Sequence, residues 1–85
     1  MKLSLEISKY PLADDYIPAI ADFIERLNAY PNLRIVGNTM STQVFGDFDE
    51  VMAAYSKEMK YSYEKWGKAI FVCKFINGDL SPSDA

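Results

Sequence analysis

The sequence predicts an α+β fold, a ferredoxin-like βαββαβ sandwich with a four-stranded antiparallel-type sheet and two helices on one face. Three observations predict it: strict alternation of apolar and polar residues at the N-terminus, two segments with apolar residues at helical spacing, and three further β-rich segments. Their order is the split βαβ arrangement of this fold. The first and third strands then lie adjacent at the sheet centre, and we expect them to run parallel.

The first strand covers residues 2–10, in which polar and apolar side chains alternate from Lys2 to Ser8. Its apolar face is expected to pack on a core, and its polar face to stay open. Pro11 ends the strand. Asp14 and Asp15 then offer side-chain oxygens that cap the backbone amides of a helix whose first turn contains Pro18.

The first helix has apolar residues at helical spacing from Ile17 to Leu27. It is expected to end near Tyr30, because Pro31 disfavours the helical conformation of its predecessor and lacks the next hydrogen-bond donor. The sequence therefore predicts an amphipathic helix directly before the second strand.

A β-hairpin follows this helix. Leu33–Val36 and Ser41–Phe45 are rich in β-forming residues, and Gly37–Asn38 supplies turn chemistry between them. Asn38 tolerates positive φ, which favours a turn role for it. Gly46 is expected to break the second strand of the hairpin.

The second helix begins with a capping-box pattern, Asp47 followed by Glu50. We expect it to run to about Lys65 and to be closed by Gly67. Ala69–Ile76 is apolar apart from one lysine, which predicts a strand covered on both faces.

Length and composition predict one domain that associates with itself. The chain has 85 residues, of which 49% are hydrophobic and 14% aromatic, more than a small monomer hides easily. We expect a single ligand-binding domain over residues 1–79, a flexible C-terminal tail over residues 80–85, and a homodimer or tetramer.

Several classes of protein are disfavoured by charge and cysteine content. The lone Cys73 cannot form an intrachain disulfide, and the N-terminus lacks the pattern of a secretory signal, so we expect a cytoplasmic protein. No apolar run is long enough to cross a bilayer, and the net charge of −3 gives no general attraction to nucleic acid. We therefore expect no membrane partner and no nucleic-acid partner.

The chain lacks an evident catalytic apparatus. It contains no histidine, and Cys73 lies in an apolar strand, where packing explains it. Helix capping explains the acidic group of Asp47, Asp49 and Glu50 better than a metal site does. The sequence thus predicts no catalytic residues, no metal site and no cofactor, and it favours binding.

Glu6 is the most unusual residue, because it falls in a central strand where an unpaired carboxylate would be costly. We expect it to have a partner. In one interpretation Glu6, Ser8 and hydroxyl groups of the third strand bind the edge of a small heteroaromatic ring. In the other this surface is a subunit interface, where Glu6 pairs with Arg34 or with a lysine of a second subunit, or stays in water.

Two segments carry a resemblance to a known family: Glu6–Leu12 (EISKYPL) and Met40–Asp47 (MSTQVFGD), the latter leading into the second helix. With them the chain resembles the YkoF-like family of thiamine- and hydroxymethylpyrimidine-binding proteins, over about residues 3–79. The resemblance implies a βαββαβ fold, association through the open sheet faces, and binding of the aminopyrimidine portion of thiamine or its precursor without chemistry.

The chemistry of such a ligand fits a set of site residues chosen by their position and side-chain type. The carboxylate accepts a hydrogen bond from the ligand or shares its proton, hydroxyl groups complete the contacts to the ring edge, and a tyrosine covers the ring. We expect Glu6, Ser8 and Thr42 to form the centre of this group. The candidate ligand-binding residues are Glu6, Ser8, Tyr10, Thr39, Ser41 and Thr42.

One departure from the family concerns chain length. Some family members look like tandem repeats, whereas this chain has a single unit, so two chains would supply what one tandem chain holds. Parallel first and third strands would place Tyr10 and Ser41 toward opposite ends of the sheet, and a partner chain would bridge them.

The sequence therefore predicts non-enzymatic binding of thiamine or hydroxymethylpyrimidine in salvage, transport or sensing. The alternative is an oligomeric regulatory or interaction module without a small-molecule ligand. A third interpretation is a small dimeric α+β enzyme, because fold does not fix function; the absence of histidine disfavours it.

Overall fold

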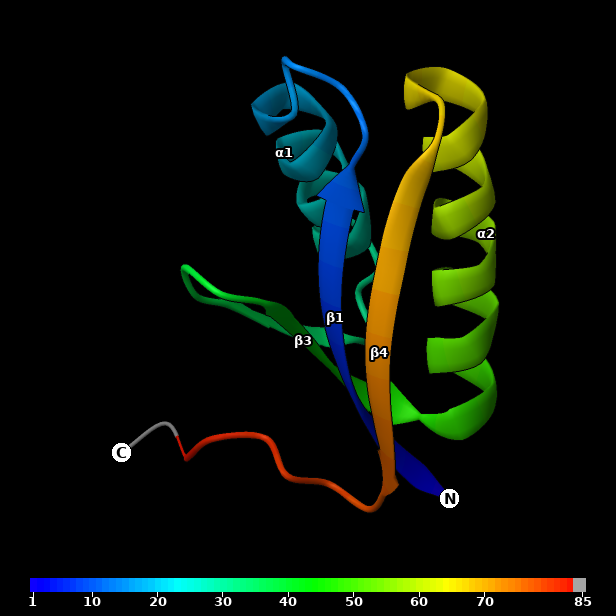
Figure 1. Cartoon of the computed structure of the whole chain (residues 1–85). Helices are drawn as coiled ribbons and strands as arrows, with labels where there is room; N and C mark the ends of the chain where they lie inside the picture. Colours follow the sequence, from blue (N-terminus) through cyan, green and yellow to red (C-terminus); the bar gives the residue numbers. More distant parts are fainter. Residues whose placement is uncertain (84–85) are drawn as a thin grey trace.

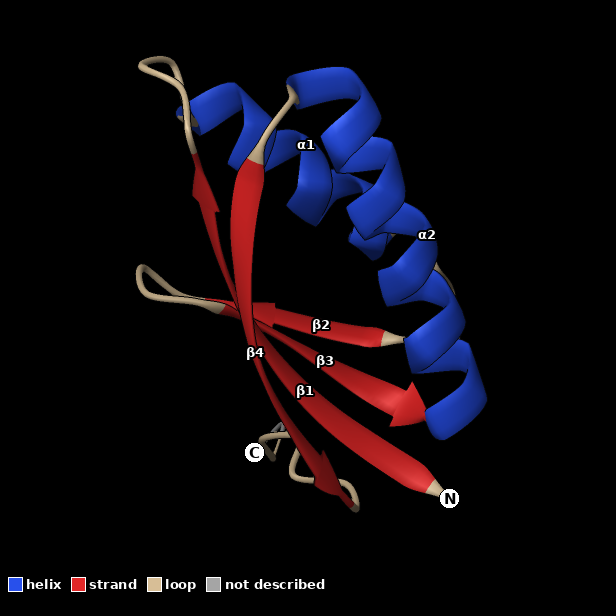
Figure 2. Ribbon diagram, turned by 45° about the vertical axis from the view of Figure 1, so that its right-hand side comes forward, coloured by secondary structure: helices blue, strands red, loops and turns tan. Residues whose placement is uncertain are grey.

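Two helices pack on one face of a four-stranded sheet in the computed structural model, which describes residues 1–83 (Figure 1). Figure 2 shows both helices on the same side of the sheet. The order of elements is the one that the sequence predicts. The elements are β1 (Lys2–Pro11), α1 (Ile17–Asn28), β2 (Arg34–Gly37), β3 (Thr42–Asp47), α2 (Phe48–Trp66) and β4 (Ala69–Asn77).

The strands are arranged in the order β2-β3-β1-β4, and all neighbours are antiparallel. The adjacency of β1 and β3 is confirmed, but the expectation that they run parallel is wrong. The helix after β1 returns the chain to the same end of the sheet, so β2 repeats the direction of β1. The hairpin then reverses β3, which therefore runs opposite to β1.

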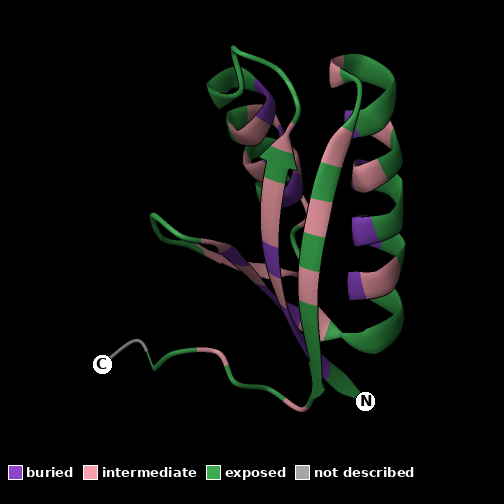
Figure 3. Ribbon diagram, viewed as in Figure 1, coloured by how far each residue is buried: buried purple, intermediate pink, exposed green. Residues whose placement is uncertain are grey.

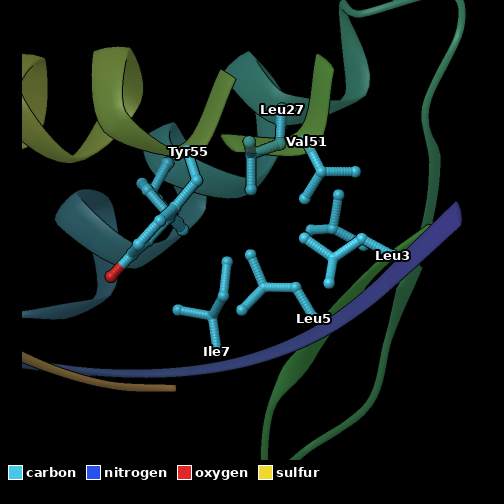
Figure 4. Close-up of a cluster of buried hydrophobic side chains, with 8 residues drawn as sticks. Leu3, Leu5, Ile7, Leu27, Val51 and Tyr55 are labelled. Atoms are coloured by element: carbon cyan, nitrogen blue, oxygen red, sulfur yellow. The ribbon is translucent and has the colours of Figure 1, made fainter. Parts of the chain in front are cut away.

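The core lies between the sheet and the helices. The odd-numbered side chains of β1 face the helices, as the alternation predicts, and Leu5 is 1% exposed. Leu27 of α1 and Val51 of α2 are fully buried against this face (Figure 4). Burying each such side chain contributes about 1.5–3 kcal/mol to stability, which makes these three residues anchors of the two layers.

The predicted side-chain caps are wrong for both helices. Tyr16 occupies the N-cap position of α1 without a side-chain hydrogen bond, so neither Asp14 nor Asp15 caps it. Asp47 is the N-cap residue of α2 but also makes no capping bond. Its carboxylate instead lies 3.0 Å from the Lys2 Nζ at the start of the neighbouring strand.

Gly46 lies within β3 and does not break it. An added Cβ at this position would lie 2.6 Å from the Leu33 Cδ2, closer than carbon atoms approach. The glycine therefore serves close packing: it lets the segment before β2 lie against β3.

The face of the sheet that points away from the helices, here called the outer face, is largely open. The sequence predicted β4 to be covered on both faces, and this is wrong for the outer one. Ile70, Val72 and Ile76 of β4 each have about half of their area exposed there (Figure 3). Neither helix of the described chain is long and apolar enough to cross a membrane.

The chain after β4 contacts one end of the outer face. The Ser4 hydroxyl donates to the Gly78 carbonyl at 2.8 Å and accepts from the Leu80 amide at 2.9 Å. Ser4 is consequently buried although it faces outward. The flexible tail expected over residues 80–85 stays a prediction, and residues 84 and 85 lie outside the described part of the chain.

Candidate functional site

A cleft of about 410 Å³ opens where β1 and β3 separate. The pairing of the two strands ends at Ile7 and Thr42. The turn between β2 and β3 projects away from β1 beyond that pair, and α1 lies on the other side (Figure 1). The volume is within the range of about 300–1,000 Å³ that small-molecule sites occupy. The lining consists of Ile7–Pro11, Tyr16, Ile20, Phe23, Ile24 and Asn38–Thr42.

Helix α1 provides an apolar wall. Ile20, Phe23 and Ile24 recur at helical spacing and line the cleft together, while Tyr16 stands at the start of the helix. Aromatic and branched aliphatic side chains of this kind suit the face of a flat ring. The wall therefore favours a planar ligand.

The turn opposite α1 is held by its own hydrogen bonds. The Asn38 Oδ1 accepts from the backbone amides of Met40 at 2.7 Å and Ser41 at 2.9 Å. The backbone amide of Asn38 donates to the backbone carbonyl of Ser41 at 3.0 Å. This confirms the turn role of Asn38, but Asn38 acts through its side-chain oxygen and not through a positive φ, which no non-glycine residue of residues 1–83 adopts. The turn fixes the place from which Ser41 reaches the cleft.

Glu6 has a partner, as expected, within its own chain. The Ser41 hydroxyl donates to the Glu6 Oε2 at 3.0 Å, and the Lys74 Nζ of β4 lies 3.7 Å from the Oε1. Both partners lie beside Glu6 on the outer face of the sheet. Glu6 itself is outside the lining of the cleft and reaches it through Ser41.

The structure brings five of the six predicted site residues to the cleft. Ser8, Tyr10, Thr39, Ser41 and Thr42 all line it, although they come from two separate segments. Because β1 and β3 are antiparallel, Tyr10 and Ser41 lie toward the same end of the sheet. The expectation that they lie at opposite ends is wrong, and no partner chain is needed to bridge them.

The expected central group of Glu6, Ser8 and Thr42 does not share one surface. Thr42 stands opposite Ile7 in the antiparallel register, so it faces the helices and is buried. Glu6 and Ser8 point to the outer face. The cleft spans both faces because it lies where the sheet splits, and Ser41 is the hydroxyl that connects Glu6 to it.

Lys9 lines the cleft and was not among the predicted residues. Its Nζ donates to the Ala19 carbonyl at 2.9 Å and to the Ser62 hydroxyl, and it lies 5.4 Å from the centre of the Phe23 ring. Burial lowers the pKa of this ammonium group below its usual value, and the nearby Asp22 carboxylate partly offsets that effect. The signal in the sequence was a lysine on the apolar face of the first strand.

No protein family matches the sequence, and no curated protein does. Solved structures match its fold. Protein SP2199 from Streptococcus pneumoniae superimposes with a TM-score of 0.84 at 22% identity, over 94% of this chain and 90% of that chain. A Thermotoga maritima protein provisionally assigned to thiamine biosynthesis or salvage gives 0.79 at 18% identity, over 95% and 85%. DUF77 from Bacillus cereus, a domain of unknown function, gives 0.71 at 13% identity, over 98% and 82%.

These likenesses show the fold. The predicted ferredoxin-like sandwich is thereby confirmed, both by the order of elements and by the superposition on solved structures. Identities of 13–22% say nothing of the ligand.

Proposed function

We propose that this protein is a YkoF-like, non-enzymatic binder of thiamine or its hydroxymethylpyrimidine moiety, acting in salvage, transport or sensing in the cytoplasm. The cleft supports this by combining an apolar wall for a flat ring with hydroxyl groups for its polar edge. The similar fold of the Thermotoga maritima protein is consistent with the proposal. The proposal includes no chemical step and no cofactor.

The observation that carries the proposal is the pairing of Ser41 with Glu6. Because the Ser41 hydroxyl donates its proton to the carboxylate, its oxygen is left as an acceptor at the cleft. An aminopyrimidine has an exocyclic amino group that donates. The ligand amino group, the Ser41 oxygen and the Glu6 carboxylate then form a chain of hydrogen bonds that runs toward the negative charge.

Calorimetry with thiamine and with hydroxymethylpyrimidine tests the proposal. Removal of the acceptor in Ser41→Ala should weaken binding roughly two- to tenfold, the usual effect of one net hydrogen bond. Glu6→Gln should also weaken it, because the serine then donates to a neutral partner. Glu25→Gln makes the same change on the exposed side of α1 and should bind as the wild type does.

The proposal fails if neither compound binds to the wild type. The ligand can also bind at a different site. This is shown if Glu6→Gln and Ser41→Ala bind the compounds as tightly as Glu25→Gln does. Circular dichroism of each variant shows whether the fold is retained.

We also propose that the chain forms a homodimer or tetramer through the outer face. The exposed side chains of Ile70, Val72 and Ile76 support this, because an open apolar patch on a sheet face favours association with another chain. Light scattering on the wild type should give a multiple of the mass of 9.7 kDa. Val72→Asp should shift the protein toward monomer, and a monomeric wild type would contradict the proposal.

The same patch supports the second candidate function, an oligomeric regulatory or interaction module with no small-molecule ligand. The two functions differ in one measurement. A module of this kind would form the oligomer but give no heat of binding with thiamine or hydroxymethylpyrimidine.

A further inference from the structure

The backbone of β1 bonds to β4 and to β3 in strict alternation. At one end of β1 the Lys2 carbonyl accepts from the Gly78 amide at 2.8 Å, and beyond its other end the Leu12 amide donates to the Lys68 carbonyl at 3.1 Å. In an antiparallel sheet the amide and carbonyl of one residue point to the same neighbour. The even-numbered residues of β1 therefore bond toward β4.

The odd-numbered residues bond toward β3. The Met1 carbonyl accepts from the Phe48 amide at 2.8 Å on that side, and the register continues to the pair of Ile7 with Thr42. The next odd-numbered residue is Lys9, which the same register would place opposite Met40. Met40 instead lies in the turn that Asn38 holds away from β1.

The amide and carbonyl of Lys9 thus face the cleft without a strand opposite them. The register with β3 ends before Lys9, and no backbone bond to either group is made from the turns and loops of residues 1–83. The Lys9 side chain is not in their way, because its Nζ is bonded to Ala19 and Ser62 between the helices. What remains is one backbone donor beside one backbone acceptor at the floor of the cleft.

We propose that the Lys9 backbone amide and carbonyl bind the edge of a planar heteroaromatic ring in which an acceptor nitrogen adjoins an amino group. The amide donates to the ring nitrogen and the carbonyl accepts from the amino group, so the ring takes the place of the missing strand residue. This inference rests on the proposed function and names the ligand edge that the site recognises. The class is that of aminopyrimidines.

The surroundings of Lys9 fit such a ring. A ring in the plane of the sheet has one face toward α1, where Ile20 and Phe23 line the cleft. Pro11, the next residue whose carbonyl points to this side, has no amide hydrogen to donate. The donor–acceptor pair at this end of β1 is therefore confined to one residue, which fixes where the ring edge sits.

Nuclear magnetic resonance tests the inference directly. In the free protein the Lys9 amide should exchange with solvent faster than the Ile7 amide, which the ladder with β3 protects. Addition of 4-amino-5-hydroxymethyl-2-methylpyrimidine should shift the Lys9 amide proton downfield and slow its exchange, while Ile7 changes little. The analogue without the 4-amino group should bind at least roughly two- to tenfold more weakly, because the Lys9 carbonyl and the Ser41 oxygen each lose a donor.

A pair of variants tests the donor separately. Lys9→Ala removes the side chain and keeps the amide, whereas Lys9→Pro also removes the amide hydrogen, which an unpaired strand edge tolerates. Affinity should be roughly two- to tenfold lower in Lys9→Pro than in Lys9→Ala.

The outcomes separate the two proposals. Absence of binding to the wild type overturns both. Binding that leaves the Lys9 amide unshifted and its exchange unchanged overturns this inference and leaves the proposed function standing. Binding that shifts and protects this amide supports both.

Discussion

Replacing Gly46 by alanine is a sharp test of the packing that sets β3 against the segment before β2. The new methyl group would lie 2.6 Å from the Leu33 Cδ2, whereas carbon atoms settle at about 3.5–4.0 Å. It cannot move away easily, because Val51 Cγ2 and the Asn32 carbonyl oxygen lie 3.4 and 3.5 Å from it. The Leu33 side chain, which packs on the core, must therefore shift.

Two opposing effects determine the magnitude. Overpacking of a core costs about 1–3 kcal/mol. Replacing glycine by alanine where φ is not positive, as at Gly46, recovers about 0.4–1 kcal/mol by restricting the unfolded chain. We expect Gly46→Ala to lower the free energy of unfolding by roughly 0.5–2 kcal/mol, a visible part of the total for a domain of this size.

Urea unfolding followed by circular dichroism measures this change, and a double-mutant cycle assigns its cause. Leu33→Ala opens the space that the new methyl group needs, so the double variant should be more stable than the sum of the single changes by about 1 kcal/mol. Gly37→Ala is the matched control, because a Cβ there meets nothing within 4 Å. If Gly46→Ala is as stable as Gly37→Ala, or the cycle is additive, the reasoning is refuted.

Three further changes test other contacts. Because burial lowers the pKa of Lys9, this group binds fewer protons in the folded than in the unfolded chain just below pH 10.5, so the stability of the wild type relative to Lys9→Met should rise toward that pH. Equal pH profiles of the two proteins in urea would contradict this. Glu58→Ala should cost about 1–3 kcal/mol in thermal unfolding, because the Tyr30 hydroxyl loses its acceptor. Ser4→Ala should speed exchange of the Leu80 amide, and an unchanged rate would show that Ser4 does not hold this segment.

Local patterns predicted the elements well and the contacts between them less well. The alternation in β1 correctly placed Leu5 in the core and Glu6 outside it, since side-chain direction in a strand is a local property. The face of Thr42 could not be read in this way, because short β-rich segments do not fix which residue stands opposite which. The register with Ile7 decides it.

The starts of the helices also depend on contacts between elements that local sequence does not show. Asp14, Asp15 and Asp47 are good capping residues by type, yet none makes a capping bond. Asp47 is within reach of Lys2 only because β1 and β3 are paired, and an exposed ion pair of this kind competes on nearly equal terms with a cap. Chain neighbours alone do not show that competition.

The direction of β3 was predictable, and it matters most for the site. A chain that crosses over once and then turns back in a hairpin must present its third strand antiparallel to its first, so the far end of β1 meets the start of β3. The turn before β3, held by Asn38, then leaves β1 directly after the pair of Ile7 with Thr42. This early departure creates the cleft and leaves the backbone amide and carbonyl of Lys9 without a partner on β3. A single local event thus produces both the space for a ring and the backbone groups that would bind its edge. A change in the turn that paired Met40 with Lys9 would fill the cleft and would also satisfy the Lys9 amide and carbonyl.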